Sequence, residues 1–132
     1  DGDAFVYFEE ADLLHTGDLM FSGMFPFVDI TSGGSFAGFV DASQAMSDLI
    51  GDETRIIPGH GALSTKTDIT AIIDMLEGSM AAVQAEIDAG KDIEATLDAA
   101  PLTPWVEDWA SGFINEARFT RLIYADLSAD SE

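Results

Sequence analysis

Two segments of the sequence place a side chain that can bind a metal ion next to glycine, each directly after an apolar run. In residues 14–21, Asp18 follows a glycine, and in residues 56–61, His60 lies between two glycines. Aspartate offers hard oxygen ligands and histidine offers an imidazole nitrogen, and both types of atom bind zinc. Because apolar runs of this length are typical of strands, the two side chains are expected to converge at one edge of a sheet.

These segments resemble the last two ligand motifs of the metallo-β-lactamase superfamily of metal-dependent hydrolases. In that family the aspartate of a Gly-Asp pair bridges two metal ions, and the histidine of Pro-Gly-His-Gly binds one of them. The resemblance gives these roles to Asp18 and His60. Residues 25–35 and residues 109–127 are also similar to later parts of one branch of the family, so the resemblance covers most of the chain.

The chain departs from the family pattern in its small number of ligands. The first family motif, His-x-His-x-Asp-His, and the next single histidine lie upstream of the Gly-Asp pair, and neither is present here. The sequence has two histidines, His15 and His60, whereas a complete site of this family needs about five. The resemblance therefore implies the C-terminal half of an α/β (α+β) four-layer αββα fold, with one mainly antiparallel or mixed sheet, helices on one face and extra C-terminal helices.

The function implied by the resemblance is metal-dependent hydrolysis of an ester, thioester, amide or phosphoester. Asp18 would be both the catalytic residue and a metal ligand, and His60 a metal ligand. The implied cofactor is zinc, two ions in the complete protein, with a small-molecule substrate as partner. This chain alone is expected to bind zinc weakly or not at all and to be inactive. The alternative is a non-catalytic acidic binding or oligomerisation module, in which both residues are relics.

Each candidate residue also has a simpler interpretation. An aspartate after glycine often caps a turn, and His60 can be an ordinary loop histidine. Strand alternation places the His15 side chain on the opposite face from Thr16, and a position that supports the site is the alternative. We predict a structural role for His15, at an edge or in the core. Residues 32–35 are expected to cap the following helix rather than to hold an anion.

Composition limits the other function classes. With 25 acidic and 5 basic residues among 132, the net charge is −20, which disfavours nucleic acid and anionic membranes as partners and favours salt adaptation. The 47% of hydrophobic residues is enough for one packed unit. We expect this unit to span residues 1–132, with strands, site loops and the first helix in 1–64 and helices in 65–132. Because residue 1 is Asp, the native start, with any export signal that it carries, is expected to lie upstream, and the localisation is open.

Hydrophobic periodicity predicts the individual elements. Strands are expected at residues 4–8, 13–15 and 54–57, the first two antiparallel, with a short fourth strand at 27–30 inside a loop. Helices are expected at residues 36–50 after a Ser35 cap, at 69–87, at 93–97, and after an Asn115 cap as far as 127. Pro101 and Pro104 are expected to break the chain.

Half of a sandwich leaves one sheet face without its partner layer. Five apolar residues are expected near that face: Phe5, Tyr7, Met20, Phe25 and Phe27. A second copy of the chain can cover such a face, so we predict a homodimer that high salt strengthens by screening the charge repulsion. Sedimentation across a salt series tests this prediction.

Overall fold

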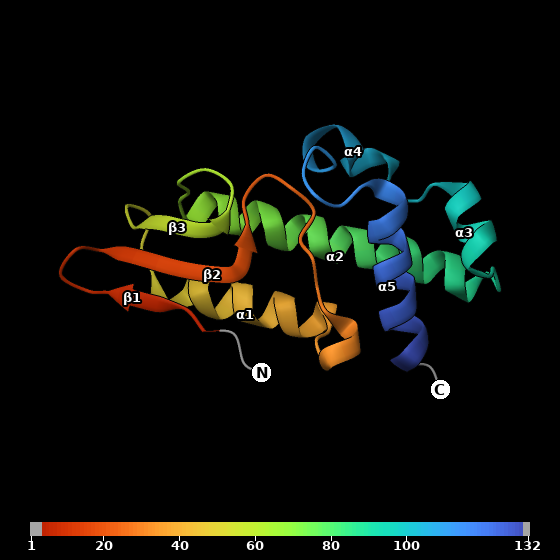
Figure 1. Ribbon diagram of the computed structural model, residues 1–132, viewed down its shortest axis with the longest axis horizontal. Coiled ribbons are helices and arrows are strands. Elements are labelled where there is room, and N and C mark those ends of the chain that lie inside the picture. Colours follow the sequence, from red (N-terminus) through yellow and green to blue (C-terminus); the bar gives the residue numbers. More distant parts are fainter. Residues whose placement is uncertain (1–3, 131–132) are drawn as a thin grey trace.

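The chain forms a small mixed sheet and five α-helices within residues 4–130, the part that the computed structural model describes (Figure 1). In chain order the elements are β1 (Val6–Phe8), β2 (Leu13–Phe21), the 3₁₀ helix η1 (Ile30–Ser32), α1 (Phe36–Leu49), β3 (Arg55–His60), α2 (Lys66–Asp88), α3 (Ile93–Ala99), α4 (Thr103–Trp109) and α5 (Glu116–Asp130). The expected mixed class of strands and helices is confirmed. None of the described helices is long and apolar enough to cross a membrane.

The three strands lie in the order β1-β2-β3, with β1 antiparallel and β3 parallel to β2. The predicted antiparallel pairing of the first two strands is therefore confirmed. A parallel neighbour needs a crossover connection, and α1 provides it between β2 and β3. As a result, the C-terminal ends of β2 and β3 lie at the same edge of the sheet.

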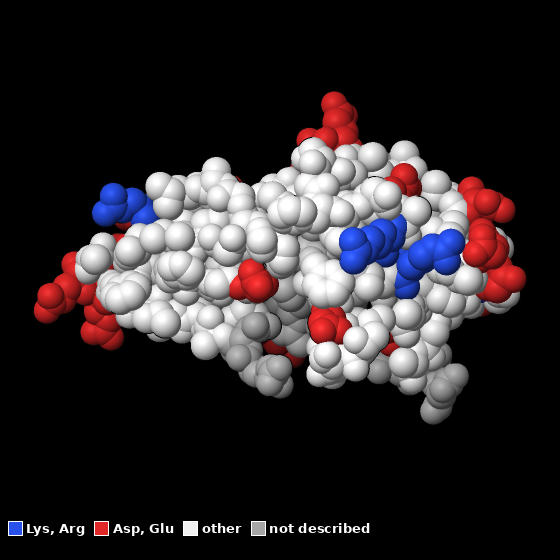
Figure 2. Space-filling view, in the orientation of Figure 1, with Lys and Arg blue, Asp and Glu red and all other residues white. Residues whose placement is uncertain are grey.

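Strand alternation divides the sheet into a buried face and an exposed face. Leu14 and Ile56 are fully buried, and Tyr7, which pairs with Leu14, shares their face. On the opposite face, the side chains of Val6 and Phe8 are 52% and 50% exposed. In Figure 2, residues other than Lys, Arg, Asp and Glu cover most of the area over the strands, and acidic side chains stand out at both ends of the molecule and at the top of the view.

The expected composition of the exposed face is wrong for four residues, which lie in the core or pack against it: Phe5, Tyr7, Met20 and Phe25. The loop after β2 continues past the end of the strand toward η1 (Figure 1), and in it the backbone N–H of Phe25 donates to the carbonyl oxygen of Trp109 at 2.8 Å. Phe25 then stacks on Phe119, with ring centroids 4.3 Å apart. An exposed sheet face with apolar side chains is present at Val6 and Phe8. Dimerisation through this face stays a prediction.

The core lies where the sheet, the loop after β2 and three helices meet. Helices α1 and α2 run side by side, and α5 crosses α2 (Figure 1). Phe36 of α1 meets Phe119 of α5 edge to face at 5.5 Å. Phe36 and Phe119 are fully buried, as are Leu76 of α2 and Ile123 of α5. Burial of large side chains such as these is the main force that holds α5 against the rest of the domain.

Local capping determines where the helices begin. The Ser35 hydroxyl accepts a hydrogen bond from the N–H of Gly38 at 2.9 Å, and the Asn115 side chain accepts one from the N–H of Arg118 at 2.9 Å. Both predicted caps are therefore confirmed. Helix α2 begins three residues before Ile69 because Thr65 and Asp68 form a capping box.

Three predictions about individual elements need correction. Strand β2 extends to Phe21 instead of ending near residue 15, because β3 pairs with it along that length. Residues 27–30 form no strand, since the N–H of Ile30 bonds within the loop to the carbonyl of Val28 at 3.0 Å. The proline segment forms α4, because Pro104 lies in the first turn, where its missing N–H would have no helical partner.

Candidate metal centre

Asp18 and His60 meet at the edge of the sheet where β2 and β3 end. His60 Nε2 lies 3.2 Å from Asp18 Oδ1. The His60 side chain is 37% exposed and the Asp18 side chain is 68% exposed, so both can reach solvent. The predicted convergence of the two residues is confirmed.

The contact depends on an irregular stretch in β2. Gly17 pairs with Pro58 and Phe21 pairs with His60, so four steps along β2 match two steps along β3. The additional residues of β2 bulge out of the regular pairing, which bends a strand and turns a side chain in a new direction. Asp18 therefore lies inside β2 at this bulge, and not just past the end of the strand as expected.

Gly17 supplies the backbone conformation that the bulge needs. Its φ is +54°, in the left-handed region that glycine adopts with little cost. The hydroxyl of the buried Thr16 donates to the Gly17 carbonyl oxygen at 2.9 Å. The direction of the Asp18 side chain is thus determined by the residues immediately before it.

The glycines on either side of His60 allow β3 to approach β2 closely. A Cβ atom on Gly59 would lie 2.5 Å from the carbonyl oxygen of Gly17. A Cβ atom on Gly61, whose φ is +102°, would lie 2.5 Å from the carbonyl oxygen of Ser22. The Pro-Gly-His-Gly segment therefore has a steric requirement for both glycines.

Two aromatic rings fix the plane of the His60 imidazole. Phe21 stacks on it at 4.7 Å between centroids, and Phe113 meets it edge to face at 5.0 Å. The N–H of Ser22 also donates to the His60 carbonyl oxygen at 2.8 Å. Sequence reasoning missed Phe113 because it follows α4, far along the chain, and no local pattern connects it to His60.

His15 takes no part in this pair. Its side chain is exposed and lies on the opposite face from Thr16, as strand alternation predicts. The predicted place at an edge or in the core is wrong, because His15 is exposed on the middle strand of the sheet. Its structural role is the 3.2 Å hydrogen bond that Nδ1 accepts from the N–H of Gly17. His15 therefore supports the start of the bulge that carries Asp18.

The pair provides two donor atoms of the kinds that zinc accepts, one carboxylate oxygen and one imidazole nitrogen. Within residues 4–130, no set of three or more His, Cys, Asp or Glu side chains is close enough to hold a metal ion. Two ligands are half of the four that a tetrahedral zinc site uses. Comparison of the sequence with models of known families and with curated proteins finds no match.

Asp12 helps to keep β3 in register with β2. Its carboxylate Oδ1 accepts hydrogen bonds from the hydroxyls of Tyr7 at 2.8 Å and Thr54 at 2.5 Å, and its carbonyl oxygen accepts one from the N–H of Arg55 at 3.2 Å. The hydrogen bonds from Thr54 and then Tyr7 lower the pKa of Asp12, and the same carboxylate raises the pKa of Tyr7. The turn after β1 is thus connected to the strand that carries His60.

Asp12→Asn is expected to destabilise the protein at neutral pH and to have less effect in acid. Because the folded pKa of Asp12 lies below its ordinary value of 3.8, the stability from its ionised form is present above that value and disappears as the pH falls through the folded pKa. Thermal melting of both proteins from pH 7 to pH 2 measures the difference. Asp41→Asn, an exposed change of the same charge on α1, is the control. A difference between Asp12→Asn and wild type that is unchanged at every pH would contradict the assignment.

Proposed function

We propose that the complete protein is a metal-dependent hydrolase of the metallo-β-lactamase superfamily and that Asp18 and His60 are two of its metal ligands. The observation that supports the proposal is the 3.2 Å approach of His60 Nε2 to Asp18 Oδ1. The two residues come from separate segments, each of which resembles a ligand motif of that family. A sheet with helices on one face and an exposed apolar face is also compatible with half of an αββα fold.

The chemistry follows from the two donors and their surroundings. Zinc at this place would supply Lewis acidity and lower the pKa of a bound water. Asp18, mostly exposed on the bulge, presents carboxylate oxygens that can bind a cation or accept a proton from an attacking water. His60 is restrained by Phe21 and Phe113. The substrate would be an ester, thioester, amide or phosphoester.

Zinc titration followed by NMR tests the assignment directly. The protein has two histidines, so it gives two sets of imidazole signals, one of which serves as an internal control. We expect the His60 signals to shift and the His15 signals to stay in place, with weak affinity because two ligands form only part of a site.

Variants complete the titration. Zinc binding measured by calorimetric titration should be lost in His60→Ala, which lacks the reporting ring, and in Asp18→Asn, whereas His15→Ala should keep it. Zinc binding that survives the loss of His60 would contradict the assignment. Tight one-to-one binding that requires His60 would show that the site is more complete than the pair.

The non-catalytic acidic module is the second candidate, and the exposed sheet face favours it. Val6 and Phe8 present apolar side chains to solvent on that face, which is typical of a surface that binds a partner. The sequence encoded upstream separates the two candidates. A His-x-His-x-Asp-His motif there supports the hydrolase, and its absence supports the module.

A further inference from the structure

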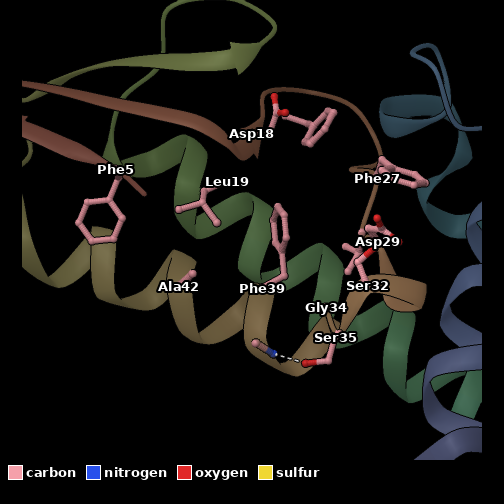
Figure 3. Close-up of a pocket in the computed structure, with 14 residues that line it drawn as sticks. Phe5, Asp18, Leu19, Phe27, Asp29, Ser32, Gly34, Ser35, Phe39 and Ala42 are labelled. Carbon is pink, nitrogen blue, oxygen red and sulfur yellow. Dashed lines mark hydrogen bonds between the residues drawn. The ribbon is translucent and has the colours of Figure 1, made fainter. Parts of the chain in front are cut away.

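A cavity of about 570 Å³ opens beside Asp18, between β2, the loop that follows it and helix α1 (Figure 3). Seven apolar residues form much of its wall, among them Phe5, Leu19, Phe27, Phe39 and Ala42. In Figure 3, Phe5 and Ala42 lie toward one end, Leu19 and Phe39 lie in the middle, and Phe27 and Asp29 lie toward the other end. A volume of this size is typical of a pocket for a small organic molecule.

Asp18 lies on the rim of this cavity. Its carboxylate points away from Leu19 and Phe39 in Figure 3, toward the side where it contacts His60. A molecule inside the cavity would therefore extend from the candidate metal centre along α1. The cavity is placed where the organic part of a substrate would lie.

The charge on the wall is entirely acidic. Asp18 and Asp29 line the cavity, and no Lys, Arg or His is among the described residues that do so. The hydroxyl of Thr31 donates to Asp29 Oδ1 at 2.7 Å, and hydrogen bonds from Thr31 and Ser32 lower the pKa of Asp29 and keep it ionised at neutral pH. With a net charge of −20 around it, the cavity favours a cation over an anion.

The loop that carries Asp29 is held in one conformation. The N–H of Gly34 donates to the Asp29 carbonyl oxygen at 3.0 Å, and a Cβ atom on Gly34 would lie 2.7 Å from that oxygen. Gly33 has a φ of +96°, which favours glycine. Asp29 is therefore presented to the cavity by a preformed turn.

We propose that this cavity binds the organic part of the substrate as an apolar aliphatic or aromatic body that carries a protonated amine toward Asp29. The body packs on Leu19 and Phe39, and the ammonium pairs with the Asp29 carboxylate. That the bound molecule is a substrate rests on the proposed function of Asp18. That the cavity binds an amine does not depend on that function. This assigns amine-bearing compounds, rather than carboxylates or phosphates, as the substrate class.

Three probes of equal chain length test the proposal in buffer that contains a metal chelator: hexylammonium, hexanol and hexanoate. We expect hexylammonium to bind about tenfold more tightly than hexanoate, because one ion pairs with Asp29 and the other is repelled by it. Amide signals of Gly33, Gly34 and Gly38, which line the cavity, should shift with hexylammonium. Hexanoate binding as tight as that of hexylammonium would overturn the proposal, and would point instead to Arg118, whose guanidinium lies 5.6 Å from the centre of the Phe27 ring.

Four variants locate the binding. Asp29→Asn should reduce the preference for the amine and leave hexanol binding unchanged, while Asp41→Asn, outside this cavity, should change neither. Ala42→Trp should fill the cavity and weaken hexylammonium and hexanol binding at least about tenfold. Ala45→Trp, exposed on the same helix, is its control. If Ala42→Trp and Ala45→Trp act alike, the cavity is not the binding site.

The chelator separates this proposal from the metal assignment. Amine binding in the cavity together with no His60 response to zinc would leave the cavity proposal standing and reject the metal site. A zinc response at His60 together with no amine preference would leave the metal site standing and reject the cavity proposal.

Discussion

Replacing Gly59 by alanine should separate Asp18 from His60 and destabilise the fold by about 2 kcal/mol. The added Cβ would lie 2.5 Å from the Gly17 carbonyl oxygen and 2.8 Å from Asp18 Oδ1. Backbone cannot move aside as the end of a flexible side chain can, so β3 must shift away from β2. Denaturant unfolding measures the stability, and the zinc response of the His60 ring measures the site.

Gly51→Ala is the matched control for Gly59→Ala. A Cβ on Gly51 meets nothing within 4 Å, so the control is expected to be neutral or to stabilise the protein by up to about 1 kcal/mol. A Gly59→Ala protein with full stability and an unchanged zinc response would show that the close approach of the two strands is not required.

The second large effect is expected at Asp126, a buried carboxylate of α5 with 8% of its surface exposed. Its Oδ2 accepts a hydrogen bond from the N–H of Phe36 at 2.9 Å, at the first residue of α1. Asp126→Ala leaves that buried N–H without its partner and removes a negative charge from a helix N-terminus. We expect a loss of about 2 to 3 kcal/mol in the free energy of unfolding.

Asp126→Asn separates the two contributions, because an amide oxygen can still accept the hydrogen bond without the charge. It should cost about 1 kcal/mol. Asp74→Ala, on the exposed side of α2, should change stability by less than about 0.5 kcal/mol. Hydrogen exchange at the Phe36 amide should accelerate in Asp126→Ala. Unchanged exchange together with unchanged stability would show that the contact between α5 and α1 contributes nothing.

The elements that the sequence predicts well are those with local causes. Ser35 and Asn115 cap helices through atoms three residues away, and both are visible in the sequence as polar residues before an apolar periodic segment. The convergence of Asp18 and His60 was also predictable, because each follows a strand-like run and the two motifs resemble parts of one site. These features need little knowledge of the rest of the fold.

The features that escaped prediction depend on contacts between distant segments. Alternation in β1 places Tyr7 on the opposite face of the sheet from Val6 and Phe8. Which of the two faces is buried follows only from the pairing of Tyr7 with the buried Leu14. Phe25 is buried because Phe119 stacks on it, and the bulge at Asp18 arises from the pairing of β2 with β3. No local pattern indicates either partner.

The connection of β2 to β3 through α1 has a consequence for how the site can change in evolution. Asp18 and His60 both lie on this β2-α1-β3 unit, whereas Phe113, which covers one edge of the imidazole, belongs to the segment between α4 and α5. Substitutions or insertions at Phe113 would alter access to the His60 ring and its restraint, while the backbone positions of Asp18 and His60 are set by the β2-α1-β3 unit. Under the proposed function, the cover of the site can therefore change in evolution while the two residues proposed as metal ligands keep their places in the fold.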